Sequence, residues 1–329
     1  MAGGVETSRT ARSDSPDDIV LPFGTVRSRM AGRIVRLGDA VDRVLAGHDY
    51  PEAVSQTLGE ALALTALLGQ PIKPGGRLIL QTKTDGPLGF LVTQYASPGG
   101  LRGYASFDRE RIAELAVEGR VDPGQVIGKG RMALTIDPGG EQESHQGIVP
   151  LEGGTLSEAA NAYFRQSEQL PTFIALAVAR HMTPGPANAD SQVASRGWRW
   201  RAGGLVLQHV PAAGGDPRPD ETPEERDARL DGSDDEDWVR VSTLAATVEA
   251  HELTDPTLSP ERLLLRLFHE EGVRVSPEVA MEARCRCSRE RIKGFLDGFS
   301  AEERASMREA DGAITVTCEF CSTRYRFED

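Results

Sequence analysis

Two short sequences, Cys285-Arg286-Cys287 and Cys318-Glu319-Phe320-Cys321, contain all four cysteines of this 329-residue chain. Thirty residues separate the two pairs, and both pairs lie within the last 45 residues. Thiolates bind zinc at about 2.3 Å, and four of them complete the tetrahedral shell of a structural zinc site. The first pair is tighter, and the gap longer, than in common zinc ribbons, but the overall spacing suits one site. The pattern therefore predicts that Cys285, Cys287, Cys318 and Cys321 bind a zinc ion.

The composition restricts the class of protein. The net charge of -13 argues against a nucleic-acid partner, because phosphate binding needs clustered lysine and arginine. No apolar run is long enough to span a membrane, and residues 1–20 lack the apolar segment of a secretory signal. We therefore expect a cytoplasmic protein with no membrane partner. Because cytoplasmic thiols are normally reduced, a disulfide framework is the less favoured interpretation of the cysteines.

Residues 21–210 have the mixed pattern of an N-terminal α+β domain. Apolar side chains at helical spacing predict a helix at residues 51–68. Thr155 and Glu158 form a capping box that opens a helix through about residue 166. Apolar and β-branched runs predict strands at residues 77–83, 88–96, 101–107, 131–137, 146–151, 172–178 and 205–208. The polar residues 1–20 predict a disordered tail before this domain.

The middle of the chain changes character twice. Residues 211–237 contain eleven acidic residues and three arginines, with many prolines and glycines, and this predicts an acidic disordered insertion. Residues 238–280 then have the pattern of a helical linker, in which Ser259, Pro260 and Glu261 give a strong helix start. The helix that follows is apolar on nearly every side, so it must pack on the N-terminal domain or on the cysteine module. That surface is either ordinary core or a surface that can be uncovered.

Residues 281–329 make up a small C-terminal four-cysteine zinc domain. Its expected elements are a helix from Ser288 to Phe299, a second helix opened by a capping box at Ser300, a strand at 314–317 and a return strand at 325–327. A module of about 45 residues is at the lower limit for folding on its own apolar core. Zinc binding, worth roughly 10–16 kcal/mol in small zinc peptides, would therefore supply much of its stability.

Oxidation of the thiolates to disulfides would release the zinc. Two neighbour disulfides, Cys285–Cys287 and Cys318–Cys321, would close loops of only three and four residues. Each would contribute roughly 1.5–2 kcal/mol, which does not replace the metal, so the module should unfold. A cross-pairing such as Cys285–Cys318 would constrain more of the chain. The distances in a tetrahedral site do not choose between these pairings.

Four arginines, Arg284, Arg286, Arg289 and Arg291, surround the first cysteine pair. Cationic neighbours favour thiolate over thiol, and thiolate character makes a cysteine susceptible to peroxide. The same arginines could instead neutralise the double negative charge of a zinc ion with four thiolates. Two interpretations therefore stay open, a static zinc ribbon and a reactive redox centre.

No catalytic constellation stands out elsewhere. None of the six histidines lies at ligand spacing from another, and the sequence has no phosphate-binding loop, Gly-x-Ser-x-Gly motif or distinctive carboxylate pair. We therefore expect a protein that is not an enzyme. Two other functions would also use the cysteines and stay open as alternatives to a redox-reactive zinc centre. One is a thiol–disulfide oxidoreductase that uses Cys318 and Cys321, and the other is a static zinc-ribbon binding protein.

These motifs resemble the 33 kDa heat-shock family of redox-regulated molecular chaperones. The cysteine segments match as Cys285-Arg-Cys287-Ser-Arg-Glu-Arg291 and as Cys318-Glu-Phe-Cys321 with Tyr325 and Phe327 after it. A second signature is Tyr-Phe-Arg-Gln-Ser-Glu-Gln-Leu-Pro-Thr at residues 163–172, and residues 147–153, 203–208 and 266–271 also fit. The resemblance covers about residues 20–329, and two stretches depart from the family: the tail before about residue 20 and the acidic insertion at 211–237.

The resemblance implies an ATP-independent holdase of the cytoplasmic response to oxidative stress. In the reduced, inactive state, zinc is expected on the four cysteines. Oxidation is expected to form the Cys285–Cys287 and Cys318–Cys321 disulfides, to release zinc, and to unfold the linker and the module, which acts as a redox switch. The exposed apolar surface would then bind unfolding client proteins, and the oxidised chaperone is expected to be a homodimer.

Overall fold

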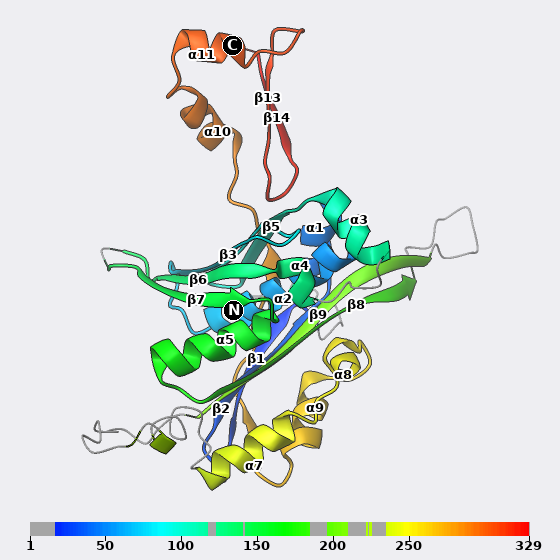
Figure 1. Ribbon diagram of the computed structural model, residues 1–329, viewed down its shortest axis with the longest axis vertical. Coiled ribbons are helices and arrows are strands. Elements are labelled where there is room, and N and C mark those ends of the chain that lie inside the picture. Colours follow the sequence, from blue (N-terminus) through cyan, green and yellow to red (C-terminus); the bar gives the residue numbers. More distant parts are fainter. Residues whose placement is uncertain are drawn as a thin grey trace, which may run out of the picture.

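The computed structural model describes residues 17–117, 123–140, 142–184, 196–209, 222, 224–225 and 235–328. Most of the predicted tail and most of the predicted acidic insertion lie outside these residues. The described chain combines sheets with helices and ends in a small module beyond the sheets (Figure 1). The predicted α+β class, with an N-terminal sheet domain and a C-terminal cysteine module, is confirmed.

The described part of the N-terminal domain is built on two largely antiparallel sheets. The first has the order β10-β1-β2-β9-β8, with β11 also paired to β1, and the second has the order β12-β5-β4-β3-β6-β7. The strands of the first sheet are β1 Ile19–Thr25, β2 Ala31–Leu37, β8 Thr172–Pro184, β9 Arg196–Gln208, β10 Val273–Val275 and β11 Val279–Ala280. Those of the second are β3 Arg77–Thr84, β4 Phe90–Ala96, β5 Gly100–Ser106, β6 Lys129–Asp137, β7 His145–Glu152 and β12 Glu282–Ala283.

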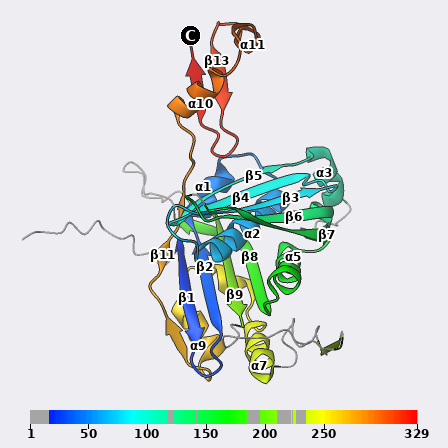
Figure 2. The ribbon, with the colours of Figure 1, turned by 90° about the vertical axis from the view of Figure 1, so that its left-hand side faces the viewer.

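Helix α2, Glu52–Gly69, forms the centre of the core and contacts strands of both sheets (Figure 2). Its side chains Val54, Leu58, Leu62 and Leu67 are fully buried. A helix that is apolar on nearly every side needs this two-sided environment, because a surface helix leaves one face in water. Helix α1, Asp39–Ala46, packs beside it and also touches β9 and β5.

Most predicted elements of this domain are confirmed. Strands β3 to β7 lie within two residues of their predicted bounds. Thr155 and Glu158 make the predicted capping box of α5, Leu156–Tyr163, but the chain continues as a π-helical turn, Phe164–Glu168. The remaining helices are α3 Arg109–Val117 and α4 Pro123–Ile127. The strand predictions at 172–178 and 205–208 were too short, since β8 and β9 pair along their whole length in a long hairpin.

The linker helices fold back over the first sheet. They are α7 Glu236–Ala245, α8 Ala250–Thr254 and α9 Pro260–Phe268. The predicted start of α9 is confirmed, with Ser259 as the cap and Pro260 in the first turn. Leu264 and Phe268 of α9 belong to a second buried cluster with Phe23 and Leu205 of the sheet. The apolar surface of α9 therefore packs on the N-terminal domain and not on the cysteine module.

The end of the linker is not helical. Strands β10 and β11 pair with the outer edge of β1, and β12 pairs in parallel with β5. This extended segment ties the linker to both sheets before the chain enters the module. Every helix in the described ranges is too short or too polar to cross a membrane.

The C-terminal module stands at one end of the molecule, beyond the second sheet (Figure 1, Figure 2). It contains α10 Arg289–Leu296, α11 Ala301–Ser306, β13 Ile314–Thr317 and β14 Arg324–Phe327. The predicted caps at Ser288 and Ser300 are confirmed, although α10 ends three residues before Phe299. Its buried apolar cluster is small and consists of Leu296, Ile314 and Phe327. A cluster of this size fits the expectation that a metal ion contributes to the stability of the module.

Candidate metal centre

Two loops bring the four cysteines together. Cys285 and Cys287 lie between β12 and α10, and Cys318 and Cys321 lie in the turn of the β13–β14 hairpin. The turn is tight, because the Cys318 N–H donates to the Thr323 carbonyl at 2.9 Å and the Ser322 N–H donates to the Cys318 carbonyl at 2.8 Å. The two Cys-containing loops thus approach each other from opposite sides.

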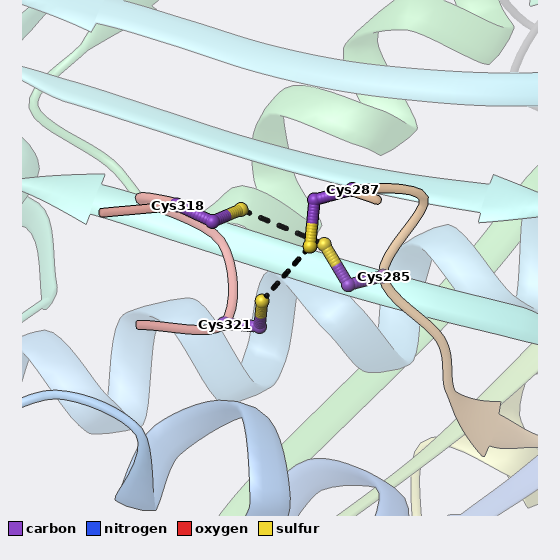
Figure 3. Close-up of side chains that lie close together, drawn as sticks. All are labelled: Cys285, Cys287, Cys318 and Cys321. Carbon is purple, nitrogen blue, oxygen red and sulfur yellow. Dashed lines mark hydrogen bonds between the residues drawn. The ribbon is translucent and has the colours of Figure 1, made fainter. Parts of the chain in front are cut away.

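The four sulfur atoms face one another (Figure 3). They all lie within 4.8 Å of one another, with 3.7 Å between the Sγ atoms of Cys285 and Cys318 and 3.4 Å between those of Cys287 and Cys321. Bonds of about 2.3 Å in a tetrahedron would place sulfur atoms roughly 3.8 Å apart. All four cysteines are half-buried and unbridged, so the residues fit a metal ion with four thiolate ligands. No other group of three or more His, Cys, Asp or Glu side chains converges in this way in the described part of the chain.

The surroundings of the thiols differ. Burial raises the pKa of Cys287 to about 12, although the Tyr325 hydroxyl, which donates to its Sγ at 3.2 Å, acts in the opposite direction. Burial also raises the pKa of Cys318. Burial opposes ionisation of Cys321 too, but hydrogen bonds with Thr323 and the neighbouring thiols outweigh it and lower its pKa to about 7. A bound divalent cation would favour the thiolate at each position.

Only two of the four arginines that flank the first pair face the site. Arg286 and Arg291 line an open cavity beside Cys287. Arg284 instead donates to a main-chain carbonyl of the loop before β5 at 2.6 Å. Arg289 lies over an aromatic ring of β14, 4.6 Å from its centroid. Arg284 and Arg289, which the sequence placed around the first pair, therefore point to other partners.

The hairpin turn also contacts the N-terminal domain. The Ser322 hydroxyl donates to the Gly47 carbonyl at 2.6 Å, and His48 Nε2 lies 2.6 Å from the carbonyl oxygen of Glu319. Between them, the Phe320 ring lies beneath a guanidinium of β5, 4.1 Å from its centroid. The sequence carries no signal for these contacts, because the partners of the two hydrogen bonds are 271 and 275 residues apart and the two partners of the ring contact are also far apart in the chain.

The position of the Cys318–Cys321 pair bears on the oxidoreductase alternative. Cys-x-x-Cys pairs that exchange disulfides commonly use a helix N-terminus to lower the pKa of the attacking thiol. Here the pair lies in a β-hairpin turn, with α10 and α11 elsewhere in the module. The position of the pair in the fold therefore does not favour the oxidoreductase.

Comparisons with known proteins found relatives in sequence and in fold. The family model described as Hsp33 protein matches residues 18–328. The 33 kDa chaperonin of Caulobacter vibrioides is 44% identical over 314 residues, which is 95% of each chain. That of Ectopseudomonas mendocina is 38% identical over 298 residues, 90% of this chain and 88% of the relative. The crystal structure of the 33 kDa chaperonin, a heat shock protein 33 homologue, from Thermotoga maritima has a TM-score of 0.69 at 23% identity and covers 94% of each chain.

The relatives that share this fold are named chaperonins, which gives the class of protein. The chain itself is a member of the Hsp33 family. The resemblance found in the sequence is thereby confirmed, and the relatives are named as chaperonins and not as enzymes.

Proposed function

We propose that this chain is a redox-regulated, ATP-independent holdase whose switch consists of Cys285, Cys287, Cys318 and Cys321 with one zinc ion. The convergence of four sulfur atoms within 4.8 Å of one another carries the proposal. Their module is joined directly to a linker that covers an apolar sheet face. When bound, zinc supplies a cross-link between the two loops. ATP independence and action in the cytoplasm during oxidative stress are proposed from the family.

Peroxide oxidation of the centre takes two two-electron steps. In each step two thiolates form one sulfur–sulfur bond, the oxygen–oxygen bond of one peroxide breaks, and two protons complete two water molecules. We propose the pairs Cys285–Cys287 and Cys318–Cys321, as the family implies. The shortest sulfur separations instead run across the two loops, at 3.7 and 3.4 Å, so the pairing is a point for experiment. After both steps the four sulfur atoms offer no thiolate to a metal ion, and zinc release is expected.

Loss of the metal cross-link would unfold the module. Disulfides within each loop leave the two loops untied, and only Leu296, Ile314 and Phe327 form a buried apolar cluster there. The contacts of the hairpin turn with Gly47 and His48 would be lost with it. The extended segment β10–β11–β12 joins the linker to the module, and its module end, β12, contacts α1, the helix just before Gly47. Unfolding of the module would therefore next reach β12, then β11 and β10.

Release of the linker would uncover the first sheet. Helices α7 to α9 bury an apolar face of that sheet, and most of their own apolar side chains are buried against it. The buried set from both sides is Leu21, Phe23, Met30, Ile34, Ala177, Leu205, Leu207, Trp238, Val241, Ala245, Leu253, Leu263, Leu264, Leu267 and Phe268. A continuous apolar surface of this kind suits unfolding client proteins, and it could also join two oxidised chains as a homodimer.

The test measures metal release and chaperone activity on the same sample. Reduced, zinc-loaded protein is treated with peroxide at mild heat, while a chromogenic chelator reports zinc and light scattering reports aggregation of an unfolding client enzyme without ATP. We expect aggregation to be suppressed as zinc is released, and suppression to vanish after dithiothreitol and zinc are returned. Zinc release without any gain in suppression would reject the proposal.

Two further measurements separate the alternatives. Peptide mapping of the oxidised chain distinguishes the pairs Cys285–Cys287 and Cys318–Cys321 from cross-pairs between the loops. A disulfide turnover that survives Cys285→Ser would favour the oxidoreductase. A fold that stays intact after peroxide treatment would favour the static zinc ribbon.

A further inference from the structure

An open cavity of about 310 Å³ lies where the module meets the second sheet. Two of its arginines, Arg77 on β3 and Arg102 on β5, come from the N-terminal domain. Two others, Arg286 and Arg291, come from the module, and Cys287 completes the polar part of the lining. The cavity therefore exists only while the module is docked on the sheet.

The four guanidinium groups have few acidic partners. Arg77 pairs with Asp137, whereas Arg102 donates to the neutral Gln94 side chain at 2.7 Å. Arg291 donates to a main-chain carbonyl at 3.3 Å. Arg286 lines the cavity together with the other three guanidinium groups and forms no ion pair among the described residues. Like charges held together in this way raise the free energy of the docked state unless an anion lies among them.

The metal centre alone does not balance these charges. A divalent ion with four thiolates carries two negative charges, and Asp137 adds one, against four arginines in the cavity lining. One positive charge stays uncompensated. Arg102 is in addition held in place by Gln94 and by the Phe320 ring beneath it, so its guanidinium is positioned before any ligand arrives.

We propose that this cavity binds a small tetrahedral oxyanion, such as inorganic phosphate, and that the bound anion clamps the module onto the N-terminal sheet. Planar guanidinium groups match the oxygen spacing of phosphate and sulfate and bind them through paired hydrogen bonds. Because each side of the interface supplies two of the arginines, the anion binds the docked state and stabilises it by mass action. The redox centre is closed while the module is docked on the sheet. A bound anion therefore raises the exposure to oxidant that is needed to release the module. This last consequence rests on the proposed function, whereas binding itself does not.

Binding is tested by calorimetric titration of the reduced, zinc-loaded protein with sodium phosphate, and with sulfate as an oxyanion that binds zinc poorly, at constant ionic strength. The variants are Arg102→Gln and Arg286→Gln, and the control is Arg180→Gln, whose guanidinium lies over Trp198 on the distant β8–β9 hairpin. We expect one saturable site that is weakened tenfold or more in the first two variants and unchanged in the control. Absence of saturable binding, or equal affinity in all three variants, would overturn the site and leave the arginines as charge compensation for the metal.

The clamp is tested by the rate of zinc release under peroxide, with and without saturating sulfate. We expect release to slow at least twofold in the wild-type chain and not in Arg102→Gln, whose fold is checked by circular dichroism. Equal slowing in both would reveal general salt stabilisation and overturn the clamp. If zinc release proves unrelated to client binding, the proposed function fails, yet the titration still decides the anion site.

Discussion

Hydroxyl groups on the hairpin adjust the chemistry of single sulfur atoms. Tyr325 donates to the Cys287 Sγ at 3.2 Å, and Thr323 lies 3.2 Å from the Cys321 Sγ. A divalent ion would hold Cys287 as a thiolate with or without this hydrogen bond. The hydrogen bond then lowers the nucleophilicity of the sulfur instead of changing its protonation, and so reduces its attack on peroxide. In the sequence, Tyr325 belonged to a predicted return strand and to the family match, and neither indicated a contact with sulfur. Its contact with sulfur follows from the register of the hairpin, in which Val316 faces Tyr325.

Removing the Tyr325 hydroxyl should therefore make the centre more reactive. For Tyr325→Phe we expect zinc release by peroxide to become severalfold faster at neutral pH, with the fold retained. The matched control is Tyr104→Phe on β5, whose hydroxyl bonds to Ser106 and not to sulfur. Release that is no faster in Tyr325→Phe than in the control would show that this hydrogen bond does not restrain the thiolate.

Glu60 on α2 should make stability depend on pH. Burial raises its pKa to about 7 from an ordinary value of 4.5. The carboxyl therefore stabilises the fold when protonated, fully below about pH 4.5, and this contribution is lost as the pH rises toward 7. We expect Glu60→Gln to raise the free energy of unfolding by up to about 3 kcal/mol at pH 8 and to have little effect near pH 4.5.

Denaturant titrations of both proteins at pH 5 and pH 8 check this, with the exposed Glu110→Gln on α3 as the control. The same change in the free energy of unfolding at both pH values, or a loss of stability at pH 8, would contradict the raised pKa of the half-buried Glu60.

At the scale of elements, one buried arginine holds the linker on the sheet. Arg36 of β2 is 2% exposed and donates to the carbonyls of Asp255, Glu252 and Leu258 at 2.5, 2.8 and 2.8 Å. These carbonyls lie at and after the end of α8, where the helix leaves them without partners of its own. Arg201 of β9 adds a hydrogen bond to the Thr254 carbonyl at 2.7 Å. The linker is thus held by directional bonds as well as by apolar contact.

Replacing the Arg36 guanidinium should loosen the linker while the metal stays bound. Arg36→Lys keeps the charge but cannot reach three carbonyls in one plane. We expect the reduced variant, still zinc-loaded, to bind a hydrophobic dye and to suppress part of client aggregation without peroxide. The control is Arg33→Lys on the same strand, whose guanidinium donates to Gln208 within the first sheet and, among the described residues, to no carbonyl of the linker. If Arg36→Lys behaves like that control, the carbonyl contacts do not hold the linker.

Local signals predicted the elements that local chemistry controls. The capping boxes at Thr155 and Ser300 are present as expected, because each satisfies its own helix terminus. Strands β1 and β2 were not predicted, since Pro22 and Gly24 interrupt one and Arg36 gives the other an exposed pattern. Arg36 can be buried because three main-chain carbonyls accept its hydrogen bonds. These acceptors lie 216 to 222 residues further along the chain. Such a partner cannot be recognised from a window of sequence.

At the scale of the whole molecule, the candidate site was more predictable than its surroundings. Spacing alone indicated that Cys285, Cys287, Cys318 and Cys321 meet, because two close pairs in one small module have few other uses. The docking of the hairpin turn on Gly47 was not predictable, and neither was the clustering of arginines from two domains. Both depend on how the folded module docks on the N-terminal domain, and such docking produces no periodic pattern in the sequence.

In the proposed function, a metal ion at the cysteines holds both the module and the distant linker in place. Hydrogen exchange read by mass spectrometry, with zinc determined on the same reduced and peroxide-treated samples, tests it most directly. We predict that loss of one zinc per chain is accompanied by loss of protection in residues 236–268 and 285–327, while β3, β4 and β6 stay protected. If the metal leaves while α7 and α9 stay protected, the metal does not hold the linker in place.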